Sequence, residues 1–217
     1  MSDGKRIARR TLIAGAAATV LVGCSTPKPE RVVAEPTILS TDQWGAAFPS
    51  SGGEVIKREP AQIVIHHTET PNVTDLSRDQ AITLARAVQK HHMQTNGWSD
   101  SGQHFTISRG GFVLEGRHGS LNAARHRDRF VEGAQARGAN ERSIGIENEG
   151  TYHSERPPEQ QWQALVGLVA WLCDGYQLGP EAIVGHRDVS PSTCPGDAFA
   201  AVLTRLRTEV SAQLRPR

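Results

Sequence analysis

Residues 61–70 read AQIVIHHTET, an apolar run that ends in two histidines and continues into a polar loop. Short runs rich in Ile and Val and bounded by polar residues are typical of buried β-strands. Four more segments have this character, and we also predict strands at residues 104–108, 111–116, 143–149 and 182–186. The fold is therefore expected to be built around a sheet.

Three helical segments alternate with these strands. Apolar residues recur every three or four positions along residues 76–93 and 158–176, and a third helix is predicted at residues 198–214. Cys173 lies beside the apolar stripe of the second helix, so we expect it to pack in the core. Strands and helices in alternation predict an α/β domain with one sheet covered by helices on both faces.

The N-terminal segment has the features of a bacterial export signal. A basic run is followed by an uncharged apolar run that ends in LVGC at residues 21–24. The pair Arg9-Arg10 resembles a twin-arginine signal, and LVGC resembles the lipobox at which lipoproteins are cut and acylated. A membrane-spanning helix is the alternative, but residues 11–23 are fewer than the ~20 that a span needs.

We therefore expect residues 1–23 to be removed and Cys24 to be lipidated, with the protein held at a bacterial membrane on the periplasmic or extracellular side. Residues 24–38 contain three prolines and are predicted to form an extended tether, followed by one domain at residues 39–217. Loss of the signal removes four positive and one negative side chain and changes the formal charge from +1 to −2. A nucleic-acid partner is not expected, and we expect a monomer.

A second stretch, GHRDVSPSTCPGDAF at residues 185–199, places His186 eight residues before Cys194 in a segment too rich in Pro, Ser and Gly for a helix. His186 follows a predicted strand, as do His66 and His67, and strand ends are where α/β sheets place ligands. Three protein ligands and one open position are the arrangement of catalytic zinc, and a thiolate favours zinc over magnesium or calcium. These residues are therefore a candidate zinc site.

Two alternatives accompany this site. Neighbouring side chains on a strand point to opposite faces, so His66 and His67 are not expected to bind one ion together. In an exported protein, Cys194 and Cys173 are also candidates for a disulfide. We expect both thiols to be free, because one belongs to the site and the other to a helix that packs in the core.

Five stretches, in order, resemble the zinc-dependent N-acetylmuramoyl-L-alanine amidases, the group shared by phage lysozyme-type amidases and peptidoglycan recognition proteins. They are STDQWGA (40–46), IVIHHTET (63–70), HHMQTNGWSDSGQHFTISRGGFVLEGR (91–117), SIGIENEG (143–150) and GHRDVSPSTCPGDAF (185–199). The resemblance implies a single domain with a central mixed β-sheet flanked by helices on both faces. It implies zinc ligands at His66, His186 and Cys194, and hydrolysis of the bond between N-acetylmuramic acid and L-alanine in peptidoglycan.

The catalytic carboxylate is sought in SIGIENEG, where Glu147 and Glu149 are spaced to share one face of a strand. The resemblance points to Glu147 as the base that assists the attacking water, and Glu149 remains the alternative. At two positions the chain departs from the family pattern. Gln103 replaces a catalytic tyrosine and cannot exchange protons, and Ser192 replaces a lysine but can still donate a hydrogen bond to an oxyanion.

Substrate-binding residues implied by the resemblance are His92, Trp98, Gln135 and Asn140. Residues 118–131 form a longer and more polar connection than the family pattern, and they are either a specificity loop or a solvated insertion. Two other functions stay open. One is a module of the same fold that binds peptidoglycan without hydrolysing it, and the other is a zinc peptidase that cuts elsewhere in the stem peptide.

Overall fold

A mixed sheet of six strands forms the centre of the computed structural model, in the order β1-β5-β4-β7-β3-β8. Its strands are β1 (Ile38–Leu39), β3 (Gln62–His67), β4 (Phe105–Ile107), β5 (Val113–Glu115), β7 (Ser143–Asn148) and β8 (Ile183–Gly185). β4 and β5 pair antiparallel, and the other neighbours pair in parallel. A separate antiparallel ribbon joins β2 (Val55–Ile56) and β6 (Phe130–Val131). The predicted mixed sheet is confirmed.

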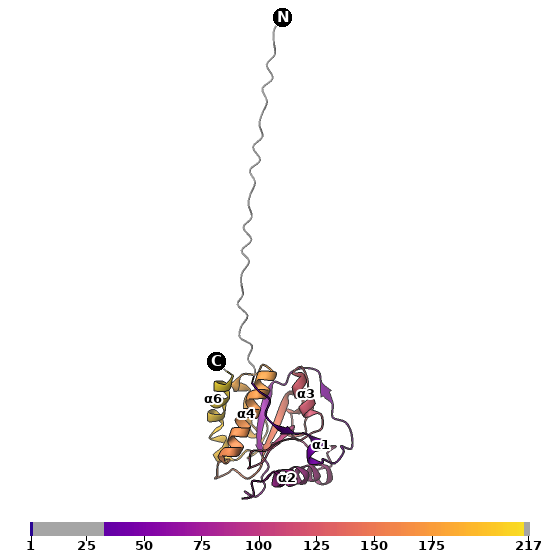
Figure 1. Cartoon of the computed structure of the whole chain (residues 1–217), viewed down its shortest axis with the longest axis vertical. Helices are drawn as coiled ribbons and strands as arrows, with labels where there is room; N and C mark the ends of the chain where they lie inside the picture. Colours follow the sequence, from indigo (N-terminus) through magenta and orange to yellow (C-terminus); the bar gives the residue numbers. More distant parts are fainter. Residues whose placement is uncertain (2–32, 215–217) are drawn as a thin grey trace. The chain divides into compact units, whose positions relative to one another are not determined.

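The structure describes Met1 and residues 33–214, and the latter are drawn in colour in Figure 1. Residues 33–214 belong to one compact unit. The predicted export signal, Cys24 and residues 24–32 of the predicted tether lie outside the described residues. Within the described part of the chain, no helix combines the length and the apolar character needed to cross a bilayer.

Residues 33–38, which we assigned to the tether, contact the domain. Ile38 is only 8% exposed and pairs with Val113 in the sheet. Glu35 forms an ion pair with Arg125 at 2.7 Å. The folded domain therefore begins before residue 39, because a short apolar pair after the last proline of this segment completes the sheet edge.

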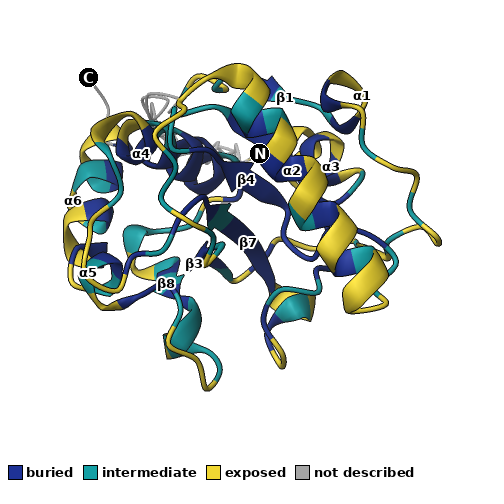
Figure 2. Ribbon diagram, turned by 90° about the horizontal axis from the view of Figure 1, so that it is seen from below, coloured by how far each residue is buried: buried dark blue, intermediate teal, exposed yellow. Residues whose placement is uncertain are grey.

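Helices cover both faces of the sheet, as predicted (Figure 2). On one face, α4 (Glu159–Gly175) and α6 (Leu203–Gln213) belong to the main core with alternate residues of the central strands. The strand residues in this core are Ile63, Ile65, Phe105, Ile107, Ile144 and Ile146. Full burial of one such side chain stabilises the fold by about 1.5–3 kcal/mol.

The opposite face is covered by α1 (Thr41–Trp44) and α2 (Arg78–Lys90). These helices enclose a smaller apolar cluster with β5, made of Trp44, Ala81, Ala85 and Leu114. Figure 2 shows α2 with one buried side and one exposed side, as expected for an amphipathic helix. Since this cluster lies over β5, the same face over β3 and β7 is left for polar side chains.

Two of the predicted helices differ in detail. The first ends at Lys90 and continues as a single π-helical turn, η1 (His91–Thr95). The C-terminal one is divided into α5 (Asp197–Ala200) and α6, because Val202 leaves the helical conformation with a φ of −105° and a ψ of 4°. Its side chain is 7% exposed and belongs to the main core.

Residues 118–131 are neither a loop nor a solvated insertion. They form α3 (Ser120–His126) and β6, and the side chains of Leu121, Ala124 and Phe130 are buried in the main core. The polar residues that made the segment look solvated, such as Arg125, lie on its outer side. This segment therefore adds to the core.

Candidate metal centre and active site

The C-terminal ends of β3, β7 and β8 bring together segments that are far apart in the sequence. The register places His66 beside Glu147. Ile65 pairs with Gly185, the last residue of β8, and His186 follows at once in the 3₁₀ turn η4 (His186–Asp188). Because side chains alternate along a strand, His66 and Glu147 lie on the face opposite Ile65 and the main core.

His66, His186 and Cys194 form the candidate metal centre. One ligand atom from each lies within 4.8 Å of the other two. Nδ1 of His66 is 3.7 Å from Sγ of Cys194, and the ring centroids of His66 and His186 are 4.5 Å apart. Two imidazoles and one thiolate fit zinc with an open fourth position. The structure thus brings together the three residues that the resemblance implied.

Backbone groups position the sulfur of Cys194. The N–H of His67 donates to this Sγ at 3.3 Å, and the N–H of Cys194 itself donates to Oγ of Ser192 at 3.0 Å. A hydrogen bond to sulfur favours the thiolate, which is the form that binds metals. Cys194 and Cys173 are both free, and Cys173 is buried in the core as expected.

Burial favours the neutral forms of these side chains. It raises the pKa of the Cys194 thiol to about 12. Burial, with His186 as the next cause, lowers the pKa of His66 to about 3. A neutral imidazole has the lone pair that a metal needs, and a divalent cation would stabilise the thiolate that burial otherwise disfavours. The electrostatics of the group therefore suit a bound cation.

Glu147 lies beside this centre. Its side chain is 15% exposed, and its Oε1 is 4.0 Å from Nε2 of His92. Burial raises the pKa of Glu147 to about 8. Burial also lowers the pKa of His92 to about 4. A carboxyl group that titrates near neutrality suits general acid–base chemistry.

Glu149, the alternative base, is held elsewhere. It is 1% exposed, and its two oxygens accept from Nε2 of Gln80 at 2.9 Å and from the backbone N–H of Arg109 at 2.8 Å. These bonds tie the end of β7 to α2 and to the turn between β4 and β5. Glu149 directly follows the end of β7 at Asn148, and its carboxylate is engaged with α2, which covers the same face of the sheet as Glu147.

His67 forms a second group with Glu69 and His153, in which one ligand atom of each lies within 4.8 Å of the others. Nδ1 of His67 accepts the backbone N–H of Tyr152 at 3.1 Å, so the proton of the neutral ring is on Nε2. That Nε2 has no hydrogen-bond partner among the described residues. The ring therefore presents a donor to Glu69 and His153, and this group is not suited to bind a metal.

Gln103 and Ser192 stand where the resemblance implied a tyrosine and a lysine. Gln103 is 1% exposed and donates to Oγ1 of Thr106 at 2.8 Å, and Thr106 is the register partner of Glu147 on β4. Ser192 is exposed, and its oxygen accepts the N–H of Cys194. Gln103 thus has a structural contact, whereas the hydroxyl hydrogen of Ser192 stays available to a ligand.

Of the four predicted substrate-binding residues, His92 approaches Glu147, and Trp98 packs against His92. Their ring centroids are 4.7 Å apart. Nδ1 of His92 accepts the N–H of Gly102 at 3.1 Å, which leaves Nε2 toward Glu147. These two rings therefore form one wall beside the carboxylate.

Gln135 and Asn140, the other two, make contacts within the protein. Oε1 of Gln135 is 2.5 Å from Nε2 of His66. Oδ1 of Asn140 accepts the backbone N–H groups of Gln135 and Ala136, both at 2.9 Å. Gln135 thus lies beside the metal centre and Asn140 stabilises the loop before β7, and the contact of either side chain with a substrate stays a prediction.

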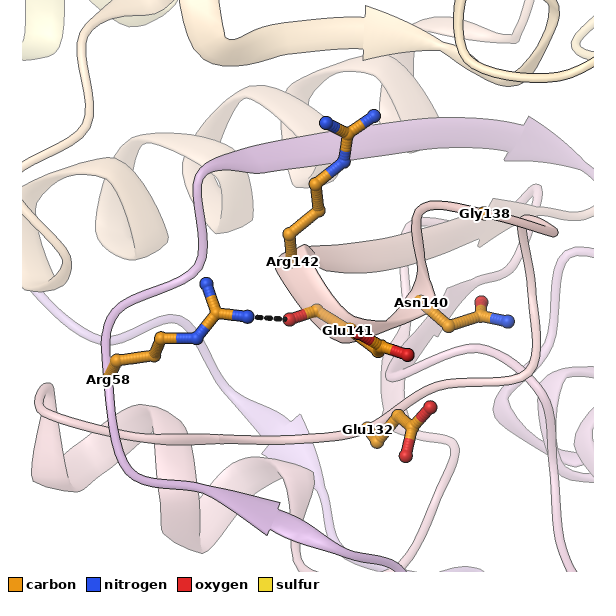
Figure 3. Close-up of a pocket in the computed structure, with 6 residues that line it drawn as sticks. All are labelled: Arg58, Glu132, Gly138, Asn140, Glu141 and Arg142. Atoms are coloured by element: carbon orange, nitrogen blue, oxygen red, sulfur yellow. Dashed lines mark hydrogen bonds between the residues drawn. The ribbon is translucent and has the colours of Figure 1, made fainter.

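Asn140 also lines a polar cavity of about 360 Å³, shown in Figure 3. The other lining residues are Arg58, Glu132, Gly138, Glu141 and Arg142. Because Arg142 directly precedes β7 and Glu147 lies near the other end of this strand, the cavity is separate from the metal centre.

Two residues of the site face were not predicted. Ser143 alternates with Gly145 and Glu147 along β7, so the period of a strand was a signal that it shares their face. Thr106 is revealed only by the register between β4 and β7, which no local pattern specifies.

Comparison with known proteins relates this chain to amidases and to peptidoglycan-recognition proteins. The N-acetylmuramoyl-L-alanine amidase family matches residues 56–197. Peptidoglycan-recognition protein LB of Drosophila melanogaster is 32% identical over 79% of this chain and 69% of its own length. The N-acetylmuramoyl-L-alanine amidase of Homo sapiens is 30% identical over 84% of this chain, but the match spans only 30% of that protein.

A solved structure of a Drosophila PGRP-LB variant in complex with tracheal cytotoxin has the same fold. The TM-score is 0.67 at 30% identity, with 77% of this chain and 92% of the other covered.

Proposed function

Since the chain belongs to the N-acetylmuramoyl-L-alanine amidase family, we propose that it is a zinc-dependent enzyme that hydrolyses the amide bond between N-acetylmuramic acid and L-alanine in peptidoglycan or its fragments. The observation that supports this proposal is the meeting of His66, His186 and Cys194 with Glu147 beside them. Binding alone does not require a carboxylate beside a metal site, whereas hydrolysis needs a group that moves a proton from the attacking water to the leaving amine.

The proposed mechanism divides the work among these residues. His66, His186 and Cys194 would hold zinc, which would supply Lewis-acid polarisation of a carbonyl and a water whose pKa is lowered to ~7. Glu147 accepts a proton from the attacking water and delivers it to the leaving amine nitrogen. The hydroxyl of Ser192 donates to the oxygen on which negative charge develops. One water is consumed, and the products are a lactyl carboxylate and a free amino group on L-alanine.

Peptidoglycan as the substrate class is supported by the relatives. They include a recognition protein in complex with tracheal cytotoxin and proteins named for the amidase reaction. The rings of His92 and Trp98 offer a wall on which a sugar or peptide can pack beside Glu147.

A second candidate function is recognition of peptidoglycan without turnover. The observation that favours it is Gln103, which stands at the position of a catalytic tyrosine, cannot exchange protons, and donates its amide N–H to Thr106. The enzyme is the better proposal, because the complete ligand set and Glu147 are both present.

We further propose that the protein is exported and held at a bacterial membrane by lipid on Cys24, on the periplasmic or extracellular side. The support is the sequence of the first 24 residues, which lie outside the described residues apart from Met1.

Digestion of purified muropeptides with the zinc-loaded protein tests the reaction. An amidase releases peptides with a free N-terminal L-alanine, together with sugar that has lost the whole stem peptide, and mass spectrometry identifies both. Zinc-dependent binding without any product would support the recognition protein. Peptide fragments cut within the stem would support a peptidase and overturn the proposal.

A further inference from the structure

Gln135 links the ring of His66 to a fixed point on the backbone. His66 faces Cys194 with Nδ1 and Gln135 with Nε2, at 3.7 Å and 2.5 Å. Nε2 of Gln135 is 2.8 Å from Oγ of Ser143, and this hydroxyl is 2.7 Å from the carbonyl oxygen of Ala139. The four groups form a single chain of hydrogen bonds that ends on the imidazole of a proposed metal ligand.

The backbone end of this chain determines the direction of each bond. A carbonyl oxygen only accepts, so the single proton of the Ser143 hydroxyl points to Ala139. The Ser143 oxygen must then accept from the amide nitrogen of Gln135, and the amide oxygen of Gln135 faces His66. That oxygen is also only an acceptor, so Nε2 of His66 carries the ring proton.

The consequence falls on the other ring nitrogen. With the proton on Nε2, Nδ1 of a neutral His66 has a free lone pair, and Nδ1 is the atom that faces Cys194. Metal-binding histidines commonly donate their second N–H to an acceptor that fixes both tautomer and ring orientation. Here the acceptor is a side-chain amide, which does not titrate and therefore stays uncharged.

The main chain leaves room for this amide. A Cβ added at Gly145 would lie 2.5 Å from Cγ and 2.6 Å from Cδ of Gln135, so only glycine allows the side chain to lie across β7. The backbone N–H of Gln135 is fixed in turn by Asn140 at 2.9 Å. The position of Gln135 is thus determined on both its backbone and its side chain.

We propose that Gln135 is a positioning residue that holds His66 as the Nε2-protonated tautomer and so presents Nδ1 to the metal. This inference rests on the proposed zinc site, but the tautomer itself is a property of the metal-free protein. It gives Gln135 a role at the metal centre in addition to the substrate contact that the resemblance implied.

The test measures tautomer and zinc affinity separately on the full chain. Nitrogen-15 spectra of the histidine rings, recorded on metal-free protein near neutral pH, report which nitrogen of His66 carries the proton. Competition with a chelator reports the dissociation constant for zinc. The variants are Gln135→Ala, Gln135→Glu and Ser143→Ala, with Gln163→Ala, an exposed position on α4, as the matched control.

We expect the parent and Gln163→Ala to show only the Nε2-protonated ring. Gln135→Ala should give a mixture of tautomers and bind zinc about 10–100-fold more weakly, the usual effect of losing such a partner. Gln135→Glu keeps an acceptor for His66 and should restore both readouts. Ser143→Ala removes the acceptor that fixes the side-chain amide of Gln135, so this amide can rotate by 180°. The tautomer mixture and the zinc affinity should then lie between those of the parent and Gln135→Ala, although no group that touches His66 has been removed.

Two results would overturn the inference: a parent ring protonated on Nδ1, or a Gln135→Ala protein with the tautomer and zinc affinity of the control. If the parent itself does not bind zinc, the proposed metal function fails instead. The spectra then still decide whether Gln135 sets the ring of His66.

Discussion

The change of Glu147 to glutamine separates catalysis from metal binding. Glutamine keeps the length of the side chain and its ability to form hydrogen bonds, but it cannot accept a proton. Glu147 lies beside His66 in the register without being one of the three proposed ligands. We therefore expect Glu147→Gln to fold, to bind zinc and to bind muropeptides nearly as well as the parent.

The size of the effect depends on whether another group can replace the carboxylate. His92 is the titratable side chain that approaches it, at 4.0 Å. Its Nδ1 accepts the N–H of Gly102, so the Nε2 that faces Glu147 carries a proton and cannot accept one. With no substitute there, the full contribution of a general base should be lost, about 10²–10⁴-fold in turnover. This corresponds to about 3–5 kcal/mol in the activation barrier.

The assay is release of N-terminal L-alanine from a purified muropeptide under saturating zinc, with Glu149→Gln as the control. Glu149 accepts two hydrogen bonds that a glutamine can no longer both accept. That variant should lose stability, by about 1.5–3 kcal/mol for a bond to a charged group. Its turnover per folded molecule should match the parent. Full activity of Glu147→Gln would refute the carboxylate mechanism, and loss of activity in Glu149→Gln alone would move the role to that residue.

Glu147→Gln should also change how the stability of the metal-free protein depends on pH. Burial raises the pKa of Glu147 from 4.5 to about 8 in the folded state. Since the ionised form is disfavoured only when the protein is folded, the parent should lose stability as the pH rises from about 4.5 to 8. Glu147→Gln lacks this loss and should be the more stable protein above that range in chemical denaturation. Zinc should reduce the difference, because a dication lowers the pKa of a nearby carboxyl group.

Three further outcomes are expected. Thiol titration of the denatured, metal-free and unprocessed chain should find all three cysteines free, and a missing pair would argue for a disulfide and against the metal centre. Cys24→Ala should accumulate as uncut precursor that no longer fractionates with membranes, whereas unchanged fractionation would contradict the lipid anchor. Leu121→Ala, at a side chain 4% exposed in α3, should lower the free energy of unfolding by about 2–5 kcal/mol, and a change below 1 kcal/mol would mean that this helix is not part of the core.

The strands and long helices were predictable because each has a local signal of its own. β3 and β7 are short apolar runs, and α4 has an apolar stripe after Pro158. Elements stabilised mainly by tertiary contacts were missed. β1 consists of two residues that gain their hydrogen bonds from β5, and α3 is rich in polar residues whose few apolar side chains reach the core.

The site shows the same division. His186 and Cys194 were found because a histidine after a strand and a cysteine on the following loop are visible in one segment. The contact between Gln135 and His66 joins residues 69 positions apart and depends on the space above Gly145. Nothing in the local sequence indicates whether a glutamine on a loop faces a ligand or supports a metal-binding ring.

Strand alternation explains why His66 and His67, although adjacent, have opposite roles. Ile63 and Ile65 are committed to the main core, so His66 must lie on the other face, beside Glu147. There its Nε2 contacts Gln135 and its Nδ1 faces the sulfur of Cys194. On the opposite side, the main chain of Tyr152 occupies Nδ1 of His67 and leaves a protonated Nε2. A shift of β3 by one residue would turn His66 into the main core and Ile65 toward the site. The same apolar alternation that stabilises the core therefore also determines which histidine can serve as a metal ligand.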